Sequence, residues 1–150
     1  MTGLRPAETL ESFNLLPIRE PKKEYLSKDR KVLEHFRFPS ISLRRTKKTF
    51  ISIMNEDILN LVEEHGDEVL NYDKVRLTFE RNHQKFYMSY CRKIFATFLR
   101  NEGIEPELID LLQGRISKSG FVRHYYRPDS SKFDLIREKL TKLHDLLTSR

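Results

Sequence analysis

Apolar residues recur at intervals of three and four along most of the chain from Asn55 to the C-terminus. This interval places side chains on one face of an α-helix, whereas a strand alternates at every second position. Asn, Gly and Pro residues, which favour helix ends, divide the pattern into segments. We therefore expect helices over residues 55–62, 72–82, 88–103, 105–114, 119–126 and 129–147.

The last of these segments has the most regular apolar stripe. Its spacing is 3-4-3-4, and its members are Phe133, Ile136, Leu140, Leu143 and Leu147. Such a stripe must be buried against another surface. That surface is either the core of this domain or a neighbouring subunit, and the sequence leaves both open.

The pattern before Asn55 is mixed. Thr2–Phe13 favours a short helix, because Pro6 is tolerated in a first turn. Val32–Phe38 partly alternates, and Thr49–Met54 is rich in β-branched and aromatic residues, so the two predict an antiparallel hairpin. The basic residues 44–48 fall in its loop or on its second strand. The expected fold class is thus mainly α with a small antiparallel β-hairpin or sheet (α+β).

Positive charge is concentrated in one stretch. Lys22–Thr49 holds ten Lys or Arg and three acidic residues, an excess of seven that exceeds the +6 of the whole chain. Such a stretch suits a polyanion such as a DNA backbone, and it also suits a solubilising surface. At 150 residues the chain most simply forms one domain, 1–150. Its single cysteine and the lack of an apolar run of about 18 residues predict a soluble, intracellular protein without a membrane span.

Four short motifs carry residues suited to chemistry on a phosphate. Each alone has an ordinary interpretation: a surface ion pair, a boundary arginine that reaches solvent, a helix C-cap, and tyrosines that stack or fill a core. The motifs are Thr2–Glu8, Ser89–Thr97, Leu111–Arg115 and Arg123–Pro128.

In this order the motifs resemble the conserved boxes of tyrosine recombinases. Thr-Gly-Leu-Arg-x-x-Glu is similar to the first box, and Tyr90–Tyr126 resembles the second, which is usually His-x-x-Arg, then Leu-Gly-His, then a tyrosine. The motifs Tyr-Cys-Arg-Lys and Leu-Leu-Gln-Gly-Arg are most similar to those of integrases of archaeal viruses and plasmids. The resemblance covers residues 2 to 128 and implies the catalytic-domain fold of that family.

The resemblance implies a role for each matched residue. Arg5 and Arg92 bind the scissile phosphate, to which the planar, permanently charged guanidinium can donate two hydrogen bonds. Arg115 stands at the family's His or Trp position and donates to the same phosphate. Glu8 orients Arg5 or its helix. Ser89 stands where many members have His or Lys, so one phosphate or proton-transfer contact is missing or is supplied elsewhere.

The general acid of the family is a lysine from the β-hairpin, which protonates the departing 5′-oxygen. The candidates are Lys47 and Lys48, and Arg44 and Arg45 blur the alignment between them. The basic residues expected to contact DNA are Arg44, Arg45, Lys93 and Arg123.

The nucleophile is a tyrosine in the fourth motif. The ninth residue after Arg115 is His124, the tenth is Tyr125 and the eleventh is Tyr126. One inserted residue is the smaller departure from the usual spacing, so we expect Tyr125 to be the nucleophile, with Tyr126 as the alternative. An unperturbed tyrosine has a pKa of about 10, so neighbouring cations must favour its phenolate as it attacks.

The resemblance further implies a site-specific recombinase that integrates viral DNA, needs no metal or other cofactor, and acts on double-stranded attachment sites inside the host cell. The last helix is expected to dock on a neighbour in a homotetramer on DNA. The family's N-terminal DNA-clamping domain is expected to be absent. The alternatives are a type IB topoisomerase-like enzyme that relaxes supercoils, and an inactive fragment that only binds DNA.

Overall fold

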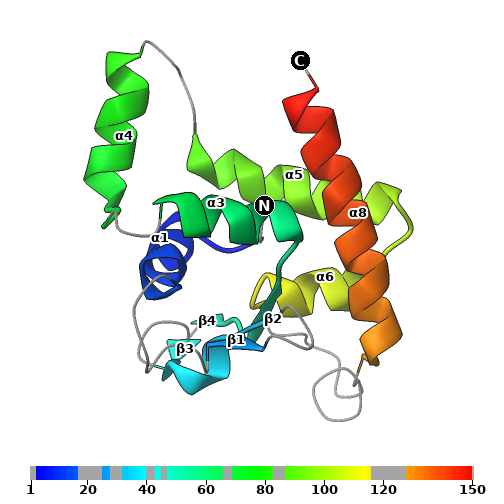
Figure 1. Ribbon diagram of the computed structural model, residues 1–150. Coiled ribbons are helices and arrows are strands. Elements are labelled where there is room, and N and C mark those ends of the chain that lie inside the picture. Colours follow the sequence, from blue (N-terminus) through cyan, green and yellow to red (C-terminus); the bar gives the residue numbers. More distant parts are fainter. Residues whose placement is uncertain are drawn as a thin grey trace.

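The computed structural model describes residues 3–16, 25–27, 32–39, 43–44, 47–65, 69–82, 87–115 and 128–149. A small antiparallel sheet lies at the lower side of the molecule in Figure 1, and the helices lie above and beside it. The described helices are α1 (Pro6–Leu15), α3 (Glu56–His65), α4 (Tyr72–Arg81), α5 (Met88–Asn101), α6 (Pro106–Leu112) and α8 (Ser130–Thr148), with a 3₁₀ turn η1 (His35–Arg37). The predicted α+β class is confirmed.

The main sheet contains β1 (Leu26–Ser27), β2 (Val32–Glu34) and β5 (Ile51–Ile53) in the order β1-β2-β5. The predicted pairing of the two strand segments is confirmed: β2 runs antiparallel to β5, with Val32 opposite Ile53. Two short strands, β3 (Leu43–Arg44) and β4 (Lys47–Lys48), form a separate ladder in the connection between β2 and β5. The basic residues therefore lie in the loop of the predicted hairpin.

The prediction of a strand over the whole of Val32–Phe38 is wrong at its C-terminal end. The strand stops at Glu34, and residues His35–Arg37 form the 3₁₀ turn. The side chain of His35 is buried and makes hydrogen bonds to two other buried groups, so the chain turns inward at this position. The alternation of apolar residues did not reveal that turn.

The predicted helices at 55–62, 72–82, 88–103, 105–114 and 129–147 are present, and their caps follow the sequence signals. Asn55 accepts a hydrogen bond from the Ile58 amide, and Asp129 accepts one from the Lys132 amide. Gly103 and Gly114 adopt positive φ after α5 and α6. The helix predicted over 119–126 lies outside the described residues.

The main core joins α5, α6, α8 and two strands. The last helix contributes Ile136, Leu140 and Leu143, which are buried, whereas Leu147 is half exposed. This stripe therefore packs on the domain's own core over most of its length. The buried members of the main core are Val32, Ile53, Phe95, Leu99, Ile104, Leu108, Ile109, Leu112, Ile136, Leu140 and Leu143.

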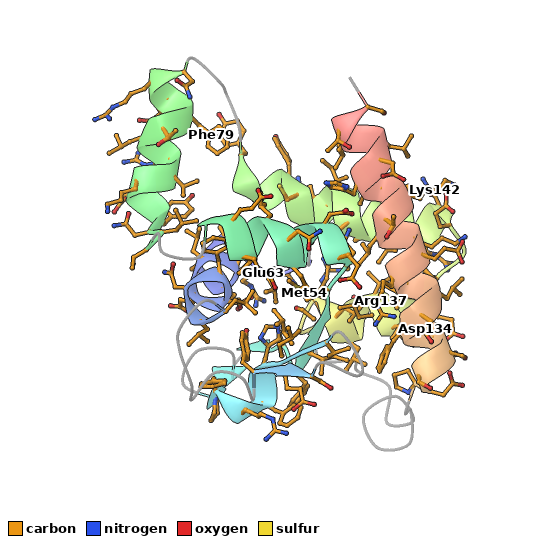
Figure 2. All side chains as sticks on the ribbon, viewed as in Figure 1. Met54, Glu63, Phe79, Asp134, Arg137 and Lys142 are labelled. Carbon is orange, nitrogen blue, oxygen red and sulfur yellow. The ribbon has the colours of Figure 1, made fainter. Side chains whose placement is uncertain are left out.

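Polar contacts fix α8 to its own chain on two sides. In Figure 2 Arg137 lies on the side of α8 that faces Met54, and its Nε donates to the Met54 carbonyl oxygen at 3.2 Å. The ammonium groups of Lys132 and Lys142 contact the carboxylates of Glu105 and Glu102 at 2.5 and 2.6 Å. None of the described helices is long and apolar enough to cross a membrane.

A second core lies between α1 and the sheet, and it contains a buried polar chain. The Tyr25 hydroxyl lies 2.9 Å from Ser12 Oγ on α1 and 2.6 Å from His35 Nδ1. His35 Nε2 lies 2.8 Å from Ser52 Oγ on β5. These four buried side chains link α1 to the sheet. The orientation of α1, and with it the residues at its N-terminus, depends on this link.

Candidate phosphate-binding site

The first predicted motif forms the N-terminus of α1. Pro6 occupies the first turn, where its missing amide donor costs nothing. Glu8, which is only 5% exposed, accepts hydrogen bonds from the Arg5 amide at 3.0 Å and from Arg5 Nη1 at 2.9 Å. The buried carboxylate thus contacts both the backbone and the side chain of Arg5.

Gly3 packs this motif against α5. Its φ is +75°, a conformation that favours glycine, and a Cβ at this position would lie 2.7 Å from Cε1 of Phe95. Phe95 follows Arg92 by three residues on α5, so the two lie on the same face of the helix. The absence of a side chain at Gly3 therefore lets the segment that carries Arg5 approach the face that carries Arg92.

Arg92 is half-buried on α5, and its Nη2 donates to the main-chain carbonyl oxygen of Gln113. Burial lowers the pKa of its guanidinium, and the positive charges of Arg5 and Arg115 lower this pKa further. The carboxylates of Glu8 and Asp110 act in the opposite direction. Both other predicted arginines are thus close enough to repel Arg92.

Arg115 follows the tight turn at the end of α6. Gly114 has φ of +64°, and the Arg115 amide donates to the Asp110 carbonyl oxygen at 2.8 Å. Its exposed side chain reaches back, so that Nη1 lies 3.3 Å from Asp110 Oδ1. Gly114 therefore sets the turn from which Arg115 extends, and the positive charge of Arg115 contributes to lowering the pKa of Arg92.

Arg5, Arg92 and Arg115 together form what we call the arginine cluster. The guanidinium groups of Arg5, at the N-terminus of α1, and of Arg115, after α6, each repel that of Arg92 on α5, and an anion bound beside Arg92 would relieve that repulsion. Among the described residues the buried Nε of Arg92 has no hydrogen-bond partner. A phosphate is the anion whose geometry guanidinium groups match best. The cluster can therefore bind a phosphate group.

The archaeal phage integrase family matches residues 11–131, most of the chain. The chain belongs to this family. Site-specific recombination or integration is the activity that the family indicates, with DNA as the partner. No curated protein and no solved structure matches the chain.

The family match includes Arg92 and Arg115 but begins after Arg5 and Glu8. The connection of the first motif to Arg92 and Arg115 therefore depends on geometry: the packing of Gly3 on Phe95 and the electrostatic effect of Arg5 on Arg92.

The other predicted residues lie in different places. Ser89 is exposed on the first turn of α5, one turn before Arg92, and the exposed Lys93 has its Nζ 5.0 Å from the centre of the Tyr90 ring. Lys47 and Lys48 occupy β4, where they pair in register with Arg44 and Leu43. Four predicted residues lie outside the described residues: Arg45, Arg123, Tyr125 and Tyr126.

Two residues at the site were missed by the sequence analysis. Gln113 is completely buried and is hydrogen-bonded to Arg92, and Asp110 pairs with Arg115. Asp110 precedes Arg115 by five residues across the helix end, a spacing that suggests no contact unless the turn is known. No group of three or more His, Cys, Asp or Glu side chains within the described ranges is placed to hold a metal ion.

Proposed function

We propose that this chain is the catalytic domain of a tyrosine recombinase, which cuts and rejoins DNA through a covalent link to Tyr125. The single observation that carries the proposal is the arginine cluster, in which Arg5, Arg92 and Arg115 meet in a chain of the archaeal phage integrase family. A site that collects permanent positive charge without an equal number of carboxylates is suited to a phosphodiester.

In the proposed reaction the phenolate of Tyr125 attacks the scissile phosphorus. A phosphorus–oxygen bond to Tyr125 forms as the bond to the 5′-oxygen breaks, which gives a 3′-phosphotyrosine and a 5′-hydroxyl. Lys47 or Lys48 supplies the proton that the departing 5′-oxygen takes up. The 5′-hydroxyl of another strand then attacks the phosphotyrosine and releases Tyr125.

The arginine cluster would stabilise the additional negative charge on the pentavalent phosphorus in the transition state. The partial burial of Arg92 strengthens its share of this effect, because charges interact more strongly where water is excluded. The reaction needs neither metal nor ATP, since the phosphotyrosine retains the energy of the broken phosphodiester. The proposed role of Glu8 is to hold Arg5. Ser89 stands where many tyrosine recombinases have His or Lys, so the contact that this residue would make to the phosphate or a proton is missing or is supplied by another residue.

The proposed substrates are double-stranded attachment sites, and an activity on them places the protein inside the host cell. We also propose that a tetramer assembles on DNA through α8. Three leucines of α8 support this, because they remain exposed after the helix has packed on its own core: Leu135, Leu146 and Leu147. The proposed catalytic domain spans residues 1–150.

A nicked suicide substrate tests the proposal. The short fragment that carries the new 5′-hydroxyl diffuses away after cleavage, so the covalent adduct cannot be religated and is trapped. Wild type should give a protein–DNA adduct on a denaturing gel, and Tyr125→Phe should give none, whereas Tyr126→Phe should retain it. An adduct that survives Tyr125→Phe and disappears in Tyr126→Phe would assign the nucleophile to Tyr126. No adduct at any salt concentration, with DNA binding intact, would instead favour an inactive DNA-binding protein.

Supercoiled plasmid separates two enzymatic alternatives. A recombinase should join strands from two DNA molecules that carry matching sites, whereas a type IB topoisomerase-like enzyme should relax the plasmid without joining. Comparison of Lys47→Ala with Lys48→Ala identifies the general acid: the variant that lacks it should recover cleavage on a substrate with a 5′-thiolate leaving group, which needs no proton.

A further inference from the structure

Gln113 is a buried polar residue that the proposed reaction does not use directly. It precedes Gly114 at the end of α6 and is 0% exposed. Its side-chain Nε2 donates to the main-chain carbonyl oxygen of Arg92 at 2.8 Å. In return, Arg92 Nη2 donates to the main-chain carbonyl oxygen of Gln113. One residue therefore contacts both the backbone and the guanidinium of Arg92.

The main-chain carbonyl oxygen of Arg92 determines how the side-chain amide of Gln113 is oriented. A carbonyl oxygen can only accept, so the amide nitrogen must face Arg92, and the amide oxygen must point away. That oxygen, Oε1, is buried and has no partner within the described part of the chain. A buried amide with an unsatisfied acceptor costs free energy that packing alone does not require, since an apolar side chain would avoid it.

Arg92 has more need of such support than an isolated arginine. Burial and the charges of Arg5 and Arg115 disfavour its guanidinium where it lies, and the hydrogen bond to Gln113 opposes displacement toward solvent. The bond occupies Nη2 on one side, while the buried Nε–H has no partner among the described residues.

We infer that Gln113 is a positioning residue that fixes the guanidinium of Arg92 for phosphate binding in the transition state. The two hydrogen bonds connect α5 to the turn that carries Arg115, so Gln113 sets the positions of two members of the arginine cluster relative to each other. The catalytic consequence rests on the proposed function, whereas the effect on Arg92 itself does not.

The test uses Gln113→Met, which retains the length and volume of the side chain but removes the amide. Asn14→Leu is the matched control. The Asn14 side-chain amide also makes two reciprocal hydrogen bonds: it donates to the Leu70 carbonyl oxygen at 2.7 Å and accepts from the Leu70 amide at 2.9 Å. The residue that it contacts is not an arginine. If Gln113→Met does not fold, Gln113→Leu, which also lacks the donor and adds no charge, takes its place.

The first measurement is the ¹⁵N relaxation of the Arg92 Nε–H signal in the free protein, assigned by its loss in Arg92→Lys. In wild type the signal should be as ordered as the backbone of α5. In Gln113→Met the signal should become more mobile than in wild type, because loss of the bond from Nε2 to the Arg92 carbonyl oxygen loosens the turn whose main-chain oxygen accepts from Arg92 Nη2. Asn14→Leu should leave it unchanged. An Arg92 signal that stays ordered in the Gln113 variant overturns the inference, whether or not the protein cleaves DNA.

The second measurement is single-turnover cleavage at saturating DNA. Misplacement of a catalytic group by about 1 Å costs about a hundredfold, so Gln113→Met should slow cleavage ten- to a hundredfold while DNA affinity changes less than about threefold. In the Arg92→Lys background the same substitution should have less than about a twofold effect, because residues that act together are not additive. Equal effects in both backgrounds, or an equal loss in Asn14→Leu, overturn the positioning role. If wild type itself does not cleave, the proposed function fails, and the relaxation measurement still decides the role of Gln113.

Discussion

The buried histidine between α1 and the sheet makes the stability of this protein depend on pH. Burial lowers the pKa of His35 from 6.5 to about 4, and the carboxylate of Glu8 partly opposes this shift. The histidine is therefore neutral in the folded protein at neutral pH. In the unfolded chain its pKa returns to 6.5, so between these two values the unfolded state takes up a proton that the folded state does not.

The direction and size of the effect follow from these two pKa values. The contribution of His35 to stability is intact above pH 6.5 and is lost as the pH falls toward 4. A pKa difference of this size corresponds to about 3 kcal/mol in total, of which about 2 kcal/mol is lost between pH 7 and pH 5. The other titratable residue in contact with His35 is Tyr25, whose pKa burial raises above its usual value. Tyr25 therefore stays neutral throughout.

Urea unfolding at pH 7, 6 and 5 measures this loss. Wild type should lose about 2 kcal/mol of unfolding free energy over this range, and His35→Gln, which cannot titrate, should lose much less. His144→Gln is the control, because His144 lies near the protein surface beside Asp57, and this variant should show the wild-type decline. A flat wild-type profile, or a decline that persists in His35→Gln, would refute the assignment of the pH dependence to His35.

Two further substitutions test the packing that assembles the arginine cluster. Gly3→Ala should destabilise the protein more than Gly103→Ala in urea unfolding. Both glycines have positive φ, and a side chain in that conformation costs about 1–3 kcal/mol, but only a Cβ at Gly3 would collide with Phe95. Equal losses of unfolding free energy would show that the Gly3 contact is unimportant. Glu8→Gln should lower the unfolding free energy by about 1–3 kcal/mol, whereas Glu80→Gln, in an exposed ion pair, should change it by less than about 0.5 kcal/mol. A Glu8 effect as small as that of Glu80 would contradict its role as the anchor of the first motif.

The helical part of the fold could be predicted from the sequence because local signals agree with burial there. Asn55 and Asp129 cap helices where their side chains suggest it, and the 3-4 spacing of Ile136, Leu140 and Leu143 matches the face that is buried. The turn at His35 could not be predicted, because a tertiary hydrogen-bond chain overrides the local strand pattern. Periodicity does not report which polar side chain finds a buried partner.

The candidate site, like the fold, could be predicted from the sequence only in part. Arg5, Arg92 and Arg115 could be selected because the order of their motifs resembles the boxes of tyrosine recombinases. Their meeting depends on packing that no local pattern encodes, such as the approach of Gly3 to Phe95. The contact of Gln113 with Arg92 could not be predicted, because a glutamine before a glycine is typical of an ordinary helix end unless the position of α5 is known.

The most direct test of the central claim is to identify the amino acid that becomes attached to DNA. The adduct formed on a suicide substrate would be digested with protease and nuclease, and the modified peptide sequenced by mass spectrometry. The account predicts a nucleotide joined through its 3′-phosphate to Tyr125. The yield of this adduct should fall at least tenfold in Arg92→Lys. A nucleotide attached to any residue outside the pair Tyr125 and Tyr126, or an unchanged yield in Arg92→Lys, would contradict it.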